Sequence, residues 1–376
     1  MQLASIALAL AVLSTISSRA AENAVQNGDF ADGVNGWSEL ANDADRTAVV
    51  IDADGGHALQ LTRKTAKATA LAVQYNIKFK PQTVYRLSVE YRGDCPAAIS
   101  FRASSSKEAA FFSLVKSYGV TSCPLPPSKE WKTETLLWDS GALPDSAFLN
   151  VRLDGEQPGA CQFRNIALTT VESNAATDEL IVMHIGDSIT LSSYLPFSER
   201  VNALLDAAIQ KEFPKLKVRN INMAADGEYV KELLETKRYE KTIKDNYKKI
   251  DIAIIRYGGN DSRFYPPAEF KKQLGLLSDN LKRDYPGVQI LIGTGTYLLN
   301  NDDVNLKQYG PYWQALRDFA AEQKFPLIDV YKRFEAEKTT KTAKAEGDMH
   351  PSAFGVQLIA ETVFAALKPI LAAKSN

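Results

Sequence analysis

The sequence predicts two domains of different class: an N-terminal all-β sandwich and a C-terminal α/β domain with a five-stranded parallel sheet. Three observations lead to this prediction. Short alternating apolar runs, divided by Gly, Pro, Asp and Ser, fill residues 22–171. Strand-like apolar runs alternate with amphipathic segments in residues 179–376. A polar stretch at 172–178 separates the two patterns and is predicted to be a linker.

The composition is that of an ordinary globular protein. Of its 376 residues, 45% are hydrophobic and 24% are charged, and the length suits about two domains. Lys and Arg number 44 against 45 Asp and Glu, so there is no net field to attract nucleic acid or an anionic membrane. We expect no nucleic-acid partner and a small neutral substrate.

Residues 1–21 are predicted to be a signal peptide. An apolar stretch runs from Leu3 to about Ile16, and small residues such as Ala20 and Ala21 suit signal peptidase. The alternative is a retained anchor, since no Lys or Arg precedes the stretch. At about 14 residues it is shorter than the roughly 20 that span a bilayer. We therefore expect a secreted or periplasmic protein with no stable membrane insertion.

The N-terminal region is strand-rich. Alternating runs occur at 83–92, 134–138 and 148–153, and many short strands at this spacing predict a β-sandwich. Cys95, Cys123 and Cys161 allow one disulfide and one thiol in an exported protein, or else three buried free thiols. Their spacing matches no zinc site.

The C-terminal region contains five successive β–α units. Strands are predicted at 180–185, 218–223, 250–257, 288–293 and 326–330. Helices are predicted at 198–213, 228–241, 268–284, 312–323 and 352–373. Right-handed crossovers then give a parallel sheet with helices on both faces, a three-layer flavodoxin-like arrangement. Its ligand crevice should lie beyond the carboxyl ends of the strands.

A serine and a histidine are expected to meet in that crevice. Ser188 follows the first strand directly, and His350 stands at the entry to the last helix. A serine attacks an ester only when a base, usually an imidazole, removes its proton. The other histidines are less well placed, because His57 belongs to the β-rich region and His184 to a buried strand. The pair predicts a serine nucleophile with His350 as its base.

Three groups are candidate donors to the oxyanion of the tetrahedral intermediate. They are the N–H of Ser188, the N–H of Gly227 and the side-chain amide of Asn260. Gly227 is predicted to open a helix, where the dipole would assist. The alternatives are that Gly227 only supplies a positive φ and that Asn260 only holds its loop together.

Asp348 is the favoured partner for the His350 ring. Pro351 biases His350 toward an extended conformation, in which residues i and i+2 share a face. Glu346 is the second choice, and a Ser–His dyad with a backbone carbonyl orienting the ring is the third.

Four short motifs resemble the four blocks of the GDSL or SGNH hydrolases. They are Gly186-Asp187-Ser188, Asn222 with Gly227, Gly258-Gly259-Asn260-Asp261, and His350-Pro351. The resemblance implies Ser188 as nucleophile, Gly227 and Asn260 in the oxyanion hole, and Asp348 and His350 as acid and base. The family usually places the acid three residues before the histidine, where this chain has Gly347. No cofactor or metal is implied.

The N-terminal region resembles jelly-roll carbohydrate-binding modules. The resemblance rests on Asn27-Gly28-Asp29-Phe30 and Trp37 near its start and on Phe163 to Leu168 near its end. Such modules hold sugars on aromatic faces, for which Tyr75, Trp131 and Trp138 are conceivable; core packing is the alternative, and we assign Trp37 to the core.

The favoured function is an exported carbohydrate esterase that acts on an acylated carbohydrate or polysaccharide through Ser188, His350 and Asp348. One alternative is a lipase, lysophospholipase or thioesterase that uses the same site. Another is a glycan-binding protein whose hydrolase site has decayed, which the displaced acid would explain.

Overall fold

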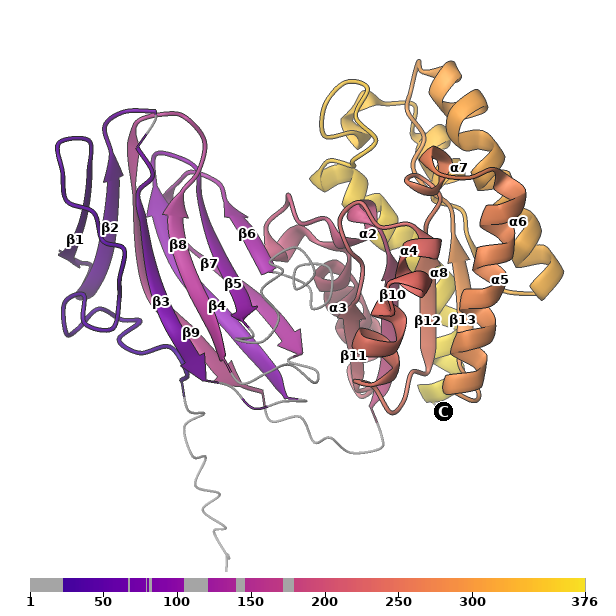
Figure 1. Ribbon diagram of the computed structural model, residues 1–376, viewed down its shortest axis with the longest axis horizontal. Helices are drawn as coiled ribbons and strands as arrows, with labels where there is room; N and C mark the ends of the chain where they lie inside the picture. The colour runs from indigo at the N-terminus through magenta and orange to yellow at the C-terminus, as the bar shows by residue number, and fades with distance from the viewer. Residues whose placement is uncertain are drawn as a thin grey trace, which may run out of the picture.

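The computed structural model describes residues 23–66, 68–78, 80, 83–104, 121–139, 146–171 and 179–375. The predicted signal peptide and the predicted linker lie outside these residues. Figure 1 shows a body of strands in the N-terminal part of the chain and a sheet with helices in the C-terminal part. We call residues 23–171 the β-domain and residues 179–375 the α/β domain.

The β-domain consists of two antiparallel sheets, ordered β1-β2-β9-β4-β7 and β3-β8-β5-β6. Its described strands are β1 (Arg46–Ala53), β2 (Gly56–Arg63), β3 (Leu71–Lys78), β4 (Val84–Gly93), β5 (Ala97–Ser104), β6 (Thr121–Leu125), β7 (Ser128–Asp139), β8 (Ser146–Leu153) and β9 (Gly159–Thr170). The predicted sandwich is confirmed.

The core of the β-domain forms because its strands alternate. In β4, Leu87, Val89 and Tyr91 are buried, whereas the residues between them are partly exposed. Trp37 is buried against Phe30, with ring centroids 5.4 Å apart, as its assignment to the core predicted. All three cysteines are buried free thiols.

The α/β domain has a parallel sheet ordered β11-β10-β12-β13-β14. Its strands are β10 (Leu180–Gly186), β11 (Val218–Asn222), β12 (Ile252–Arg256), β13 (Gln289–Gly293) and β14 (Leu327–Ile328). Numbered within the domain, this order is 2-1-3-4-5, that of flavodoxin-like folds. The strand order reverses beside β10, whose carboxyl end leads to Ser188.

The α-helices are α2 (Ser188–Leu191), α3 (Val201–Glu212), α4 (Val230–Glu235), α5 (Pro267–Asp284), α6 (Gly310–Gln323), α7 (Val330–Glu337) and α8 (Ala353–Ser375). Shorter 3-10 or π turns are η1 (Phe197–Glu199), η2 (Tyr239–Lys244), η3 (Asp261–Arg263), η4 (Asp303–Tyr309) and η5 (Thr340–Thr342). The sequence did not predict α7, and the helix predicted at 228–241 is divided into α4 and η2.

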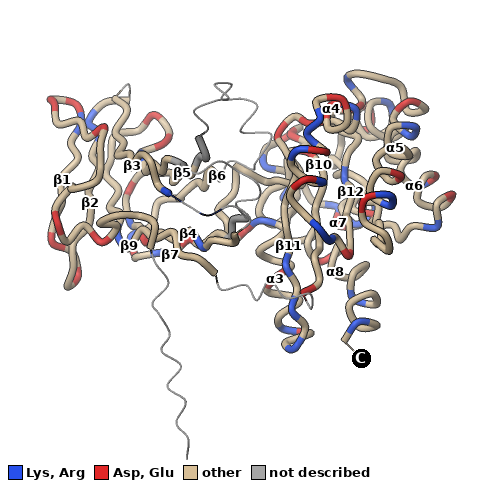
Figure 2. Tube along the Cα trace, turned by 60° about the horizontal axis from the view of Figure 1, so that its bottom comes forward, with Lys and Arg blue, Asp and Glu red and all other residues tan. Residues whose placement is uncertain are grey.

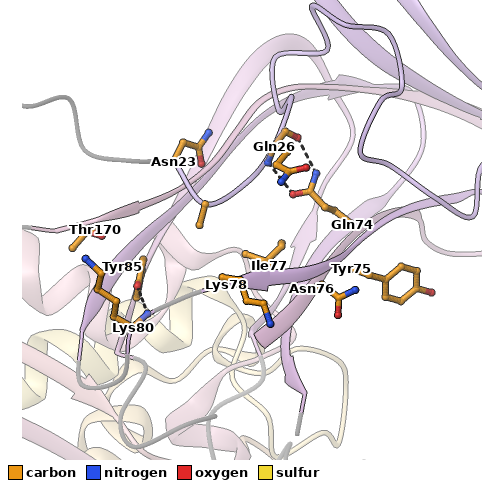
Figure 3. A pocket seen from close by; sticks show the side chains of 11 residues that line it. Asn23, Gln26, Gln74, Tyr75, Asn76, Ile77, Lys78, Lys80, Tyr85 and Thr170 are labelled. Atoms are coloured by element: carbon orange, nitrogen blue, oxygen red, sulfur yellow. Dashed lines mark hydrogen bonds between the residues drawn. The ribbon is translucent and has the colours of Figure 1, made fainter. Parts of the chain in front are cut away.

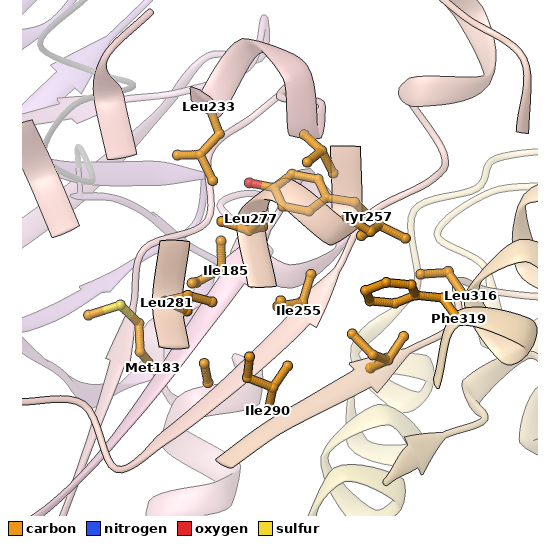
Figure 4. Close-up of a cluster of buried hydrophobic side chains, with 14 of the residues drawn as sticks. Met183, Ile185, Leu233, Ile255, Tyr257, Leu277, Leu281, Ile290, Leu316 and Phe319 are labelled. Atoms are coloured by element: carbon orange, nitrogen blue, oxygen red, sulfur yellow. The ribbon is translucent and has the colours of Figure 1, made fainter. Parts of the chain in front are cut away.

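Two apolar layers hold helices on opposite faces of this sheet. Side chains such as Met183, Ile185 and Ile255 pack against α4, α5 and α6, as Figure 4 shows. Val182 and Ile254 face α3 and α8 on the other side. Among the described helices, α8 is long and apolar enough to cross a membrane, but its inner face is buried in this second layer.

Gly295 lies so close to Trp313 that a larger residue at this position should lower stability. A Cβ on Gly295 would lie 2.2 Å from Trp313, a large buried side chain, so Gly295→Ala should lower the free energy of unfolding by about 1–3 kcal/mol. Gly275, inside α5, is the control: a Cβ there meets nothing within 4 Å. Gly275→Ala should therefore stabilise the helix by about 0.5–1 kcal/mol. Urea unfolding measures both, and equal effects would contradict the packing argument.

Candidate active site

Ser188 is placed by a tight turn at the end of β10. Asp187 caps α2, because its Oδ1 accepts a hydrogen bond from the N–H of Ile189 at 3.0 Å. A Cβ on Gly186 would lie 2.5 Å from both the Arg256 carbonyl oxygen and Thr190 Oγ1, so only glycine fits there. Ser188 is thus the first residue of a short helix at the carboxyl edge of the sheet.

The structure brings Ser188, His350 and Asp348 into one hydrogen-bonded chain. Ser188 Oγ lies 2.9 Å from His350 Nε2, and His350 Nδ1 lies 2.8 Å from Asp348 Oδ1. Burial alone would raise the pKa of Asp348, but hydrogen bonds from the backbone and ring of His350 outweigh it and lower that pKa. An ionised Asp348 accepts from Nδ1–H, which leaves Nε2 to accept the Ser188 proton.

A closed loop explains how Asp348 reaches the ring from only two residues away. Gly347 turns the chain with φ +75°, and Asp348 Oδ1 also accepts the backbone N–H of His350 at 2.9 Å. Thr296 Oγ1 donates to the Met349 carbonyl oxygen at 3.0 Å, which ties the loop to the chain after β13. Glu346, the second choice, is exposed. These hydrogen bonds therefore favour Asp348 over Glu346 as the partner of the His350 ring.

The other two histidines lie elsewhere. His184 is buried in β10 with its Nε2 3.4 Å from Asn220 Oδ1, and burial lowers its pKa to about 4. His57 lies in the β-domain, where its Nδ1 is 3.2 Å from Asp52 Oδ1. Neither ring is hydrogen-bonded to a serine in the described part of the chain, so His350 is the candidate base.

The loops of Gly227 and Asn260 are joined to each other. Asn260 Nδ2 donates to the carbonyl oxygen of Glu228 at 3.1 Å, and its amide carries a second N–H. The prediction that Gly227 opens a helix is wrong. Gly227 lies in a turn with φ +71°, and α4 begins only at Val230. Its N–H therefore gains no help from a first helical turn, and the turn itself requires the glycine.

A buried ion pair lies behind these two loops. Arg238 Nη1 is 2.8 Å from Glu228 Oε2, and the Tyr257 hydroxyl donates to the same oxygen at 2.6 Å. Arg238 Nη2 also donates to the carbonyl oxygen of Met223. This network was not predicted from the sequence, although Glu228 directly follows Gly227.

Asp261 supports the same loops from the β12 side. Its Oδ2 accepts the N–H of Gly258 at 2.9 Å, and its Oδ1 accepts the N–H of Val230 at 3.0 Å and the Tyr265 hydroxyl. One fully buried carboxyl group thereby joins the Asn260 loop to the start of α4.

Two aromatic rings extend this edge. Tyr229 and Phe264 stack with ring centroids 4.2 Å apart, and Phe264 is 58% exposed. Tyr229 follows Gly227 by two residues and Phe264 follows Asn260 by four, so the pair spans both loops. The pair was not predicted, although an aromatic residue follows each of the two motifs in the sequence.

Two candidate sugar-binding residues of the β-domain, Trp131 and Tyr75, have different surroundings. The guanidinium groups of Arg92 and Arg164 lie over the Trp131 ring, 4.6 and 3.9 Å from its centroid. These cation–π contacts account for the position of the ring without a bound sugar. Tyr75 is 50% exposed and lines a cavity of about 410 Å³, shown in Figure 3. The side chain of Trp138 lies outside what the structure describes.

No group of three or more His, Cys, Asp or Glu in the described residues is arranged to hold a metal ion.

Comparison with known proteins gives one family match for each region. Residues 184–358 match the GDSL-like Lipase/Acylhydrolase family, and residues 22–148 match a carbohydrate binding domain. No curated protein matches the chain.

Solved structures with a similar fold align to about half of the chain. A GDSL-like lipase from Parabacteroides merdae has a TM-score of 0.46 and 19% identity, covering 52% of this chain and 98% of its own. The acetylxylan esterase Axe2 from Geobacillus stearothermophilus has a TM-score of 0.44 and 22% identity, covering 50% and 94%. The family matches confirm both resemblances. Residues 184–358 are a GDSL-like lipase/acylhydrolase domain, which follows a domain of a carbohydrate-binding family.

Proposed function

We propose that this protein is an exported serine esterase that removes acetyl or similar acyl groups from a carbohydrate. The observation that carries the proposal is the hydrogen-bonded chain from Ser188 through His350 to Asp348. An activated serine with an oriented imidazole is the arrangement that acyl transfer needs.

The first half of the reaction forms an acyl-enzyme. Ser188 Oγ attacks the ester carbonyl carbon while its proton passes to His350 Nε2. The carbonyl oxygen becomes an oxyanion, stabilised by the N–H groups of Ser188 and Gly227 and by the amide of Asn260. The sugar oxygen then leaves with the proton from His350. Asp348 stays ionised throughout and stabilises the imidazolium.

The second half restores the enzyme. His350 takes a proton from water, whose oxygen attacks the acyl carbon on Ser188. Collapse of this second tetrahedral intermediate returns the proton to Ser188 Oγ and releases the carboxylic acid.

The second domain and the charge pattern support a carbohydrate substrate. The N-terminal match is to a carbohydrate binding domain, and an esterase linked to one would be held near its polymer. Figure 2 shows Lys and Arg interleaved with Asp and Glu along the chain, which favours no highly charged partner.

The decayed-site alternative depended on a displaced acid. Asp348 is nevertheless within hydrogen-bond reach of the ring, so that alternative loses its support. A lipase-type activity on the same site stays open to experiment.

We expect acetate release from at least one acetylated glycan among xylan, pectin, chitin fragments and sialic acids. On p-nitrophenyl esters, acetate should be hydrolysed faster than octanoate by about tenfold or more, because a site for a small acyl group has no room for a long chain. Ser188→Ala is the control for background hydrolysis. A preference for octanoate together with no acetate release would favour the lipase.

A further inference from the structure

The segment from Ser192 to Arg200, which follows α2, is fastened to the β-domain. Phe197 is 2% exposed and belongs to the buried cluster of the β-sandwich rather than to those of the α/β domain. Its neighbour Ser198 donates twice to Glu134 in β7, from its backbone N–H at 3.2 Å and from Oγ at 3.0 Å. The segment therefore packs into the β-domain and is hydrogen-bonded to it.

Arg200 provides a third attachment. Its side chain is nearly fully buried, and Nη2 donates to the carbonyl oxygen of Ser122 in β6 at 2.5 Å. The same guanidinium donates to the carbonyl oxygens of Ser193 at 3.1 Å and Leu195 at 3.0 Å. One buried side chain thus links the start of the segment to the β-domain.

The other side of this segment contacts the Ser188 site. The Tyr194 ring meets the His350 ring edge-on, with centroids 5.4 Å apart and planes at 74°. The adjacent Ser193 Oγ donates to Asp226 Oδ2 at 3.0 Å, one residue before Gly227. The segment therefore contacts both the base and the loop of the proposed oxyanion donor.

We propose that the Ser192–Arg200 segment makes the β-domain a structural part of the catalytic centre, with Tyr194 as a positioning residue for His350. Phe197, Ser198 and Arg200 are the anchors through which the β-domain fixes Tyr194. The inference rests on the proposed esterase function, and it gives the β-domain a role besides holding a glycan.

The exposure of His350 explains why such positioning matters. Its side chain is 40% exposed, so few contacts define its tilt about the Asp348 hydrogen bond. The Tyr194 ring packs against one side of the His350 ring in the edge-on arrangement that aromatic pairs favour. A tilt that moves Nε2 by about 1 Å from Ser188 Oγ can slow acyl transfer by about 100-fold.

A double-mutant cycle tests this coupling. Tyr194→Ala, Phe197→Ala and the double variant are assayed for kcat and KM on p-nitrophenyl acetate and for the rate of inactivation by a fluorophosphonate, which reports Ser188 reactivity. Each single change should lower kcat and the inactivation rate by about 10- to 100-fold with little change in KM. The double variant should be no slower than the slower single variant, because Phe197 acts through Tyr194.

Matched variants separate positioning from stability. Tyr194→Phe should keep kcat at the native value, since it retains the ring that contacts His350. Phe30→Ala removes a ring of the same β-domain cluster that packs on Trp37, and it should weaken folding while leaving kcat unchanged. If Phe197→Ala fails to fold, Ser198→Ala takes its place, with a smaller expected loss of kcat.

Two results would overturn the inference: a normal kcat in both Tyr194→Ala and the anchor variant, or losses that multiply in the double variant. Ser188→Ala distinguishes this failure from failure of the esterase assignment. If that variant is inactive while the Tyr194 and anchor variants are fully active, only the inference about the β-domain is lost.

Discussion

Replacing Ser188 with alanine is expected to lower kcat for ester hydrolysis by about 10⁴- to 10⁶-fold. The change removes the oxygen that lies 2.9 Å from His350 Nε2 and leaves the rest of the turn in place, because the Asp187 cap does not use the Ser188 side chain. Steady-state kinetics on p-nitrophenyl acetate measure the loss, and circular dichroism should show an unchanged fold. Activity within tenfold of the native enzyme would refute the nucleophile assignment.

Two further variants test whether the three residues act as a unit. His350→Ala should cost about as much as Ser188→Ala, and combining the two should add little, because either change already removes the activated nucleophile. Asp348→Asn should cost about 10²- to 10⁴-fold, since an amide donor opposite Nδ1 favours the wrong tautomer. A loss below about threefold would instead support a Ser–His dyad.

The order of the elements could be predicted from the sequence because each strand is a short apolar run and most helices carry an amphipathic pattern. The parallel sheet with helices on both faces followed from right-handed crossovers. The shortest elements could not be predicted from the sequence. The last strand, β14, has only two residues, and α7 follows it after a single residue, Asp329, whose side chain caps the helix. A propensity pattern this short cannot separate the two.

The Ser188–His350–Asp348 chain could be predicted from two general rules. Ligand sites lie beyond the carboxyl ends of parallel strands, and a proline such as Pro351 favours an extended conformation in the residue before it. The error at Gly227 arose because a strand followed by glycine resembles a helix start, whereas a turn of several residues intervenes here. Tyr194 and Phe197 carried no signal in the sequence. Their contacts with His350 and the β-domain depend on tertiary packing between distant segments.

The buried pair of Glu228 and Arg238 should dominate the stability of the loops behind the site. The two side chains are 0% and 4% exposed, so replacing Arg238 removes the cation that lies 2.8 Å from the buried Glu228 carboxylate. Arg238→Met is therefore expected to lower the free energy of unfolding by about 3–5 kcal/mol. Because the Glu228 carbonyl oxygen also holds Asn260, kcat should fall as well.

A second double-mutant cycle distinguishes charge from packing in this pair. Glu228→Gln combined with Arg238→Met removes both charges, and the double variant should be more stable than Arg238→Met alone, with a coupling of about 1–3 kcal/mol. Lys307→Met is the control, since its partner Asp303 lies 2.6 Å away but both side chains are largely exposed. Its urea midpoint should not change, because exposed pairs contribute little. Strictly additive losses at Glu228 and Arg238 would mean that packing volume, rather than an uncompensated charge, explains the effect.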